Sequence, residues 1–153
     1  MKQGFTLIEI ILALLVVSIG VVAAIGLLGT SLDTSAKARD DLHIVGFADL
    51  VLNHIHAMDE YSAIPTTGGN LTITNYAQEA VSIQTDNHAQ FENRVIDAGD
   101  KIRSTFTLTY LLEIERSANT PDVKTISLQV WPGYATNGTP RIFHTEVYNW
   151  TDK

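Results

Sequence analysis

The feature that most constrains this chain is an uncharged apolar segment close to its start. Residues Ile10–Leu32 are 23 residues without a single Asp, Glu, Lys or Arg. A bilayer core is about 30 Å thick and is crossed by about 20 apolar residues in a helix. The segment is therefore long enough to span a membrane, and it exceeds the apolar core of about 7–15 residues in an ordinary secretory signal. We expect a retained membrane helix.

A short polar leader at residues 1–4 contains one base, Lys2, and a single acid, Glu9, directly precedes the apolar segment. Lys2 agrees with the rule that basic residues stay on the cytoplasmic side, so the rest of the chain would lie across the membrane. A carboxylate at the start of an apolar membrane helix is energetically costly unless something offsets its charge. Glu9 is therefore either an interfacial acid solvated by lipid headgroups or one half of an ion pair.

The sequence GFTLIE at residues 4–9, followed by the apolar segment, resembles the class III signal peptide of type IV pilins and type II secretion pseudopilins. In that family a membrane-embedded prepilin peptidase cuts after the glycine and methylates the new N-terminus. The resemblance implies cleavage between Gly4 and Phe5, with N-methylation of Phe5. It also implies that Glu9 faces the N-terminal ammonium of a neighbouring subunit in a fibre, where breaking a buried ion pair costs about 3–5 kcal/mol.

The helix is expected to continue beyond the apolar segment, because no proline occurs before Pro65. Apolar residues then recur at helical spacing, at Ile44, Phe47, Ala48, Val51, Ile55 and Met58. This spacing places them on one face of a helix. We predict one helix that ends near Tyr61, with its first half in lipid or in a fibre core and its second half docked on a sheet.

Three glycines lie inside the apolar segment, at positions 20, 26 and 29. Each lowers helix propensity by about 1 kcal/mol relative to alanine. They are compatible with local melting of the helix on assembly and equally with close helix packing in a membrane.

Residues 61–104 form the connecting region, and within it the pattern is weakest at residues 75–101. The segment Pro65–Asn70 is rich in turn-forming residues. Leu71–Thr74 alternates like a short strand, Val81–Ile83 is a candidate strand, and His88–Ile96 is compatible with a helical turn or a strand. The resemblance to pilins implies a variable connecting region here, between helix and sheet.

The last third of the chain predicts an antiparallel sheet. Apolar and polar residues alternate within 105–116 and 125–130, residues 141–150 can form a third strand, and turn residues lie between these stretches. A three-stranded meander with one apolar face needs a cover, and the amphipathic half of the helix supplies it. We predict an α+β, pilin-like fold, with a long N-terminal helix packed on a C-terminal antiparallel β-meander. Its parts are a leader (1–4), a transmembrane or fibre-core helix (5–32), an amphipathic half (33–60), a connecting region (61–104) and the sheet (105–153).

Composition disfavours several classes of function. The chain has no cysteine, so it forms no disulfide and carries no thiol chemistry. Its net charge is −7, and loss of Lys2 with the leader leaves nine bases against 17 acids, which disfavours a nucleic-acid surface. His54 and His56 are two apart on a helix and no further ligand pattern joins them. No nucleophile motif surrounds a serine. We expect no metal, no cofactor and no enzymatic activity.

The resemblance implies a structural subunit that assembles helix to helix. Within the family we favour a minor pseudopilin of a type II secretion system, because the chain is acidic, small and without cysteine. Glu9 argues against the tip pseudopilin, which characteristically lacks this acid. The alternatives are a minor type IV pilin that serves adhesion, motility or DNA uptake, and a membrane-anchored binding module that does not polymerise.

The same interpretation implies partners and a location. The expected partners are prepilin peptidase, other pilin or pseudopilin subunits, an inner-membrane assembly platform and, before assembly, membrane lipid. No nucleic acid is expected among them. The expected location is the inner (cytoplasmic) membrane, crossed once with the C-terminal domain in the periplasm, and afterwards the pilus or pseudopilus.

Overall fold

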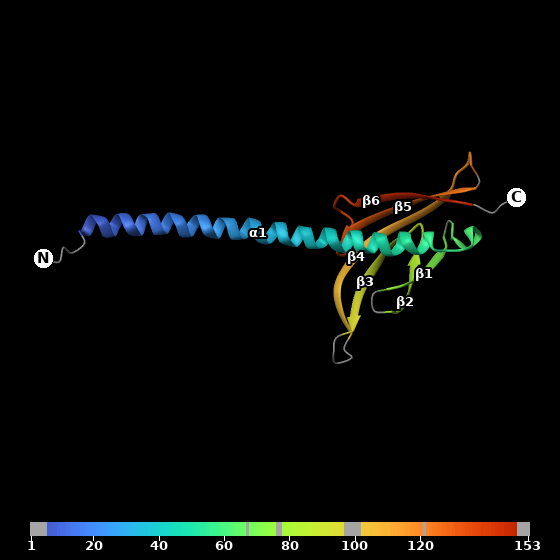
Figure 1. Cartoon of the computed structure of the whole chain (residues 1–153), viewed down its shortest axis with the longest axis horizontal. Helices are drawn as coiled ribbons and strands as arrows, with labels where there is room; N and C mark the ends of the chain where they lie inside the picture. Colours follow the sequence, from blue (N-terminus) through green and yellow to red (C-terminus); the bar gives the residue numbers. More distant parts are fainter. Residues whose placement is uncertain (1–5, 67, 76–77, 97–101, 121, 150–153) are drawn as a thin grey trace. The chain divides into compact units, whose positions relative to one another are not determined.

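The computed structural model describes residues 6–66, 68–75, 78–96, 102–120 and 122–149 (Figure 1). The chain divides into two units, residues 1–40 and residues 41–153. A long helix comes first and six strands follow a short 3₁₀ turn. The elements are α1 (Leu7–His56), the 3₁₀ turn (Tyr61–Ala63), β1 (Asn70–Thr74), β2 (Ala80–Gln84), β3 (His88–Ile96), β4 (Ile102–Arg116), β5 (Val123–Pro132) and β6 (Arg141–Tyr148).

The first unit contains the apolar part of α1. Every residue from 6 to 39 is exposed in the single chain. Three hydroxyl groups in this part donate to backbone carbonyls of the preceding turn: Ser18 to Leu14 O (2.6 Å), Thr30 to Leu27 O (3.0 Å) and Thr34 to Thr30 O (2.9 Å). Because these hydroxyls are satisfied within the helix, they add little polarity to its surface.

The second unit has its core between the remainder of α1 and the sheets. The predicted helical stripe is confirmed, since Ile44, Phe47, Ala48, Val51 and Ile55 are all buried. Phe47 sits at the centre, and its ring centroid lies 4.6 Å from that of Phe91 and 5.3 Å from that of Tyr110. These residues bury one face of the helix segment, which is how an amphipathic helix gains most of its stability.

The larger sheet has four antiparallel strands in the order β3-β4-β5-β6. Its inner face, toward α1, carries the alternating apolar residues Leu108, Tyr110, Leu112 and Ile114 of β4 and Ile126, Leu128 and Val130 of β5. The sheet is twisted, so that β6 runs nearly along the helix segment in this view whereas β3 runs across it (Figure 1). Arg141 of β6 donates two hydrogen bonds from Nη2 to the carboxylate of Asp41, at 2.9 and 3.0 Å.

A separate hairpin of β1 and β2 completes the core. Its inward residues Leu71, Ile73 and Ile83 are buried in the same hydrophobic cluster as the helix and the larger sheet. The hydroxyl of Tyr110 accepts a hydrogen bond from the N–H of Gln84 at 3.0 Å, which ties the end of β2 to β4.

Two predictions about element bounds need correction. The helix ends at His56, earlier than predicted. The N–H of Met58 donates to Ile55 O at 3.3 Å, a tighter turn than that of an α-helix, so the helix stops well before Pro65. The larger sheet has four strands instead of three, because His88–Ile96 pairs with β4 as β3. The buried Asn93 interrupts the apolar alternation of β3, which explains why its sequence pattern is weak.

The remaining strand predictions are confirmed in position. The expected strands at Leu71–Thr74 and Val81–Ile83 are β1 and β2, and the three strands of the last third are β4, β5 and β6. The predicted end of a strand at Pro132–Gly133 is the end of β5, where Gly133 adopts φ +74°. A glycine suits this position because side chains disfavour positive φ. The α+β fold with a long N-terminal helix on antiparallel sheets is thus confirmed.

Candidate functional site

The first turn of α1 is organised by a reciprocal pair of side chains. The carboxylate of Glu9 accepts hydrogen bonds through Oε2 from the N–H and from the hydroxyl of Thr6, both at 2.9 Å. In return the N–H of Glu9 donates to Thr6 Oγ1 at 3.4 Å. This is a capping box, in which the residue before the helix and the third helical residue satisfy each other's backbone donors.

Thr6 is not among the site residues predicted above, although its signal is present in the sequence. A Thr followed three residues later by Glu, just before an apolar run, is the pattern of a capping box. The same carboxylate that the resemblance assigns to assembly therefore also begins the helix. A negative charge is favourable at this end of a helix, where the macrodipole is positive.

The two oxygens of the Glu9 carboxylate differ in their use. Oε2 accepts both hydrogen bonds from Thr6. A carboxylate offers about four acceptor positions on its two oxygens. No hydrogen bond from the described residues engages Oε1, so it is available to accept from a donor outside this chain.

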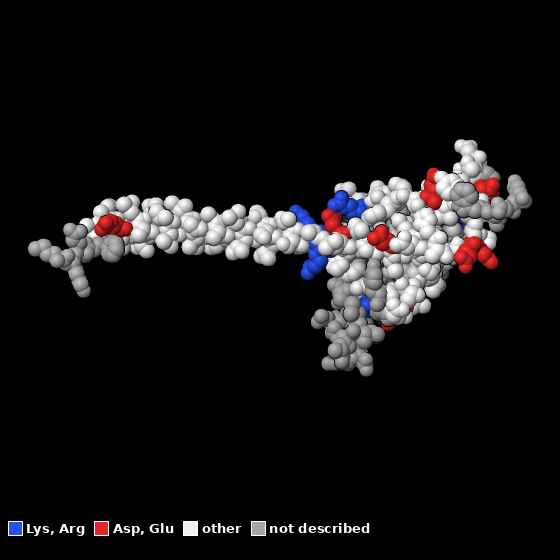
Figure 2. Space-filling model, viewed as in Figure 1, with Lys and Arg blue, Asp and Glu red and all other residues white. Residues whose placement is uncertain are grey.

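Behind Glu9 the helix presents a continuous apolar surface. Figure 2 shows this part without charge except near its start. Its large hydrophobic residues are exposed from Leu7 to Leu32, each by at least half of its surface. Among the described residues, α1 is the one helix that is long and apolar enough to cross a membrane. Such an area of exposed apolar surface needs lipid or other protein to cover it.

Of the other predicted positions, the structure describes some and not others. Gly4 and Phe5, on either side of the predicted cleavage, lie outside the described residues. The glycines at positions 20, 26 and 29 lie within the continuous helix, and a Cβ added at any of them meets nothing within 4 Å. In the single chain the helix is therefore unbroken at these glycines, and its surface beside them is open.

The histidines of the helix end do not form a ligand cluster with acids. His56 Nε2 lies 3.0 Å from Thr145 Oγ1, a hydrogen bond between the end of α1 and β6. Within the described part of the chain, no group of three or more His, Asp or Glu side chains could hold a metal ion.

Comparison with known proteins gives one match. Residues 1–25 match the family described as the prokaryotic N-terminal methylation motif. No curated protein and no solved structure matches the chain significantly. The match covers the predicted cleavage position, Glu9 and the first part of the apolar helix.

The motif implies processing by prepilin peptidase and assembly with other pilin subunits. The long apolar helix agrees with anchoring in a membrane, and its second half packs on antiparallel sheets. Residues 1–25 therefore carry the N-terminal methylation motif of the class III signal peptide found in type IV pilins, and the fold is pilin-like.

Proposed function

We propose that the protein is a structural, non-enzymatic subunit of a type II secretion pseudopilus, in the role of a minor pseudopilin. It is cleaved between Gly4 and Phe5, methylated at Phe5 and assembled through its N-terminal helix. Before assembly it crosses the inner membrane once, with residues 33–153 in the periplasm, and an assembly platform in that membrane transfers it into the fibre.

The observation that carries the fibre role is the surface of α1. An exposed apolar helix with a single carboxylate near its start is suited first to lipid and then to burial among the similar helices of other subunits. A carboxylate carried into such a core needs a cation, because an uncompensated buried charge costs several kcal/mol, about 3–5. The ammonium of a neighbouring Phe5 supplies this cation, and Glu9 Oε1 is the oxygen left to receive it.

The choice of a pseudopilus rests on composition. The mature chain carries nine bases against 17 acids and has no cysteine, which suits a periplasmic structural subunit better than a subunit that binds DNA. Because the N-terminal motif is common to pilins and pseudopilins, a minor type IV pilin is the alternative that a genetic test must separate.

The fibre role is tested by separating the charge of Glu9 from its capping function. Glu9→Gln keeps an acceptor for the Thr6 N–H but has no charge, whereas Thr6→Ala removes the hydroxyl cap and keeps the charge. We expect both variants to be cut and methylated, as measured by the mass of the mature N-terminus. Glu9→Gln should be lost from the sheared fibre fraction, and Thr6→Ala should remain in it.

Either of two results would contradict this role. One is normal incorporation of Glu9→Gln, because the pairing requires a charge. The other is a loss of Thr6→Ala equal to that of Glu9→Gln, because the capping box alone would then explain the effect. Normal function of Glu9→Ala in the membrane fraction would instead support an anchored module that does not polymerise.

The fibre type is tested in a deletion strain by two measurements made together. A pseudopilin predicts loss of secreted enzymes from the extracellular proteome with surface pili and their motility intact. Loss of pili with normal secretion would assign the protein to a type IV pilus and reject the pseudopilus.

A further inference from the structure

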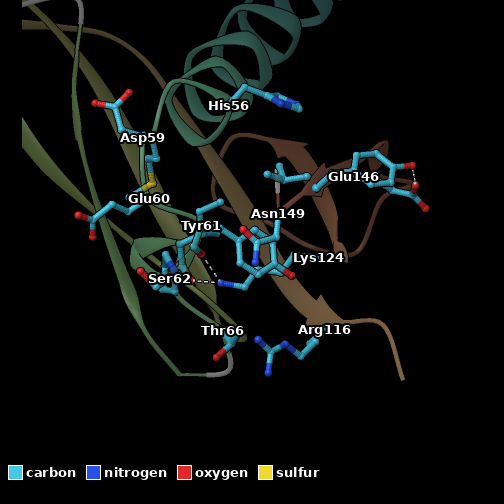
Figure 3. A pocket seen from close by; sticks show the side chains of 15 residues that line it. His56, Asp59, Glu60, Tyr61, Ser62, Thr66, Arg116, Lys124, Glu146 and Asn149 are labelled. Atoms are coloured by element: carbon cyan, nitrogen blue, oxygen red, sulfur yellow. Dashed lines mark hydrogen bonds between the residues drawn. The ribbon is translucent and has the colours of Figure 1, made fainter. Parts of the chain in front are cut away.

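An open groove lies at the end of the sheet beyond the last turn of α1, in the second unit. Its volume is about 1380 Å³. One wall is the connection that follows the helix, including Tyr61, Ile64 and Thr66, and the floor is formed by the ends of β4, β5 and β6 (Figure 3). The groove involves no residue of the N-terminal helix surface, so its function is independent of the assembly role proposed above.

The floor of the groove departs from the apolar pattern of the sheet. Along the inner face, Ile114 of β4 is followed by Arg116, and Ile126 of β5 is preceded by Lys124. Arg116 and Lys124 are directly opposed in the antiparallel register. Like charges opposite each other on neighbouring strands are destabilising. A sequence that breaks a local rule in this way commonly does so at a functional site.

Lys124 is held as a buried cation, and no carboxylate among the described residues pairs with it. Only 4 % of its surface is exposed. Its Nζ donates to the main-chain oxygens of Tyr61 (2.8 Å) and Ile64 (2.7 Å), and it lies 4.4 Å from the centroid of the Tyr61 ring. Burial lowers the pKa of Lys124, and the charge of Arg116 lowers it further. The carbonyl dipoles position this ammonium but do not neutralise it.

Arg116 is the accessible member of the pair. Its side chain is exposed, and within the described part of the chain it has no hydrogen-bond or ion-pair partner. Figure 3 shows its guanidinium directed toward Thr66 at the edge of the groove. The guanidinium therefore presents its planar fork of donors to the groove.

Three carboxylates also line the groove, but among the described residues none of them forms an ion pair with Arg116 or Lys124. The side chains of Asp59 and Glu60 point away from these cations in Figure 3. Glu146 keeps its negative charge, but its carboxylate accepts a hydrogen bond from the hydroxyl of Tyr148 and lies away from both cations in Figure 3. The acids lie on the rim of the groove, and the charge at its floor is positive.

We propose that this groove binds an acidic segment of a partner protein, with one carboxylate of that segment received by the guanidinium of Arg116. A carboxylate matches the guanidinium fork with two parallel hydrogen bonds. Its negative charge also reduces the repulsion between Arg116 and Lys124, which are opposite each other on β4 and β5. The groove is much larger than one carboxylate, and Ile64, Pro65 and Val147 offer apolar contacts to neighbouring side chains of the segment.

The test uses the purified full-length chain in detergent micelles and an acetylated, amidated hexaglutamate peptide as the probe. Isothermal titration calorimetry measures its affinity, with hexaglutamine and inorganic phosphate as comparison ligands. Arg116→Gln removes the proposed ligand. Arg94→Gln is the matched control, because it removes one positive charge from the same sheet at a residue that is paired with Glu92 outside the groove.

We expect hexaglutamate to bind and hexaglutamine not to bind. Arg116→Gln should weaken the affinity for hexaglutamate by about tenfold or more, while Arg94→Gln should change this affinity by less than about twofold. Arg116→Lys should give an intermediate affinity, because it keeps the charge but loses the fork. A circular dichroism spectrum of Arg116→Gln that matches the wild type shows that its loss of affinity is not a loss of folding.

Three results would overturn the proposal. No saturable binding of hexaglutamate would show that the groove is not a site for acidic peptides. An equal loss of hexaglutamate affinity in Arg116→Gln and Arg94→Gln would show that the peptide is attracted by positive charge in general and not by the groove. Tighter binding of inorganic phosphate than of hexaglutamate would indicate a site for a free anion.

Discussion

At the scale of single residues, the carboxylate of Glu9 serves two needs with different oxygens. Its Oε2 closes the capping box with Thr6, and this bond forms within one chain. The proposed contact with a neighbouring ammonium requires a second chain. The two roles are compatible because a carboxylate accepts more hydrogen bonds than the cap uses. A subunit can therefore keep its helix capped before and after assembly.

Lys124 gives a prediction about pH. Burial, followed by the charge of Arg116, lowers its pKa below the ordinary value of 10.5. The unfolded chain then binds this proton more tightly, so the free energy of unfolding rises with pH as pH passes through the lowered pKa toward 10.5. We expect the wild type to gain stability relative to Lys124→Met as pH is raised from neutral toward that value, measured by denaturant unfolding.

The comparison with Lys124→Met isolates this proton. The variant loses the hydrogen bonds to Tyr61 O and Ile64 O at every pH, which is a constant offset. Titration of Tyr110 occurs in both proteins and cancels. A stability difference that stays flat or falls with rising pH would show that the ammonium is not destabilised in the folded chain.

Gly69 gives a second prediction at this scale, because its neighbour leaves no room for a side chain. A Cβ at this position would lie 2.5 Å from Pro65 Cβ, which belongs to a rigid ring. We expect Gly69→Ala to lower the free energy of unfolding by about 1–3 kcal/mol, as overpacking does. Thermal or urea unfolding measures this change.

Gly138→Ala is the matched control for that prediction. A Cβ at Gly138 meets nothing within 4 Å, so its effect should stay within about 0.5 kcal/mol. Equal effects of the two substitutions would mean that the contact with Pro65 does not explain the presence of glycine at position 69.

At the scale of elements, the hairpin β1–β2 is held in place in part by contacts with the larger sheet. Its apolar residues share the core with the helix, and the Asp86 N–H donates to Leu112 O of β4 at 2.8 Å just after β2 ends. The Tyr110 hydroxyl adds the bond to Gln84. An isolated two-stranded hairpin is at best marginally stable in water, so these attachments keep it in place.

Tyr110→Phe tests this attachment. The substitution removes the acceptor of the Gln84 N–H and keeps the aromatic ring in the core, so we expect a loss of about 0.5–1.5 kcal/mol. Hydrogen exchange should become faster at the Gln84 amide. Tyr134→Phe, at an exposed tyrosine, is the control and should leave this amide unchanged. Unchanged exchange in Tyr110→Phe would mean that the hydroxyl does not hold the hairpin.

At the scale of the whole molecule, the two units differ in whether their hydrophobic residues are buried within the chain. Among the described residues, all the buried hydrophobic ones lie from Ile44 to Trp131, within the second unit. The described large hydrophobic residues of the first unit are exposed. The second unit thus has a complete core among its described residues, whereas the first requires lipid or other subunits to cover it.

A fragment of residues 33–153 should therefore fold without detergent. We expect a soluble species with the circular dichroism of a mixed α and β protein and one cooperative unfolding transition. The full-length chain should need detergent, because its apolar helix surface remains exposed. A fragment that aggregates or melts without cooperativity would show that residues 1–32 contribute to the fold of the second unit.

Much of this organisation could be worked out from the sequence, because it depends on local patterns. The apolar run, the GFTLIE motif and the helical spacing from Ile44 to Ile55 each constrain a short stretch of chain, and the structure agrees with the helix and with its buried face. The Thr6–Glu9 capping box was also readable at this level, because its two residues are three positions apart.

The rest depends on contacts between residues far apart in the sequence. β3 has a weak pattern and becomes a strand because β4 offers it a partner. Lys124 lies next to the carbonyls of Tyr61 and Ile64 only after the chain has folded back across the end of the sheet. Arg116 meets Lys124 only through the register of β4 and β5. No local pattern specifies these approaches, because they are selected by the shared burial of the helix, the hairpin and the sheet.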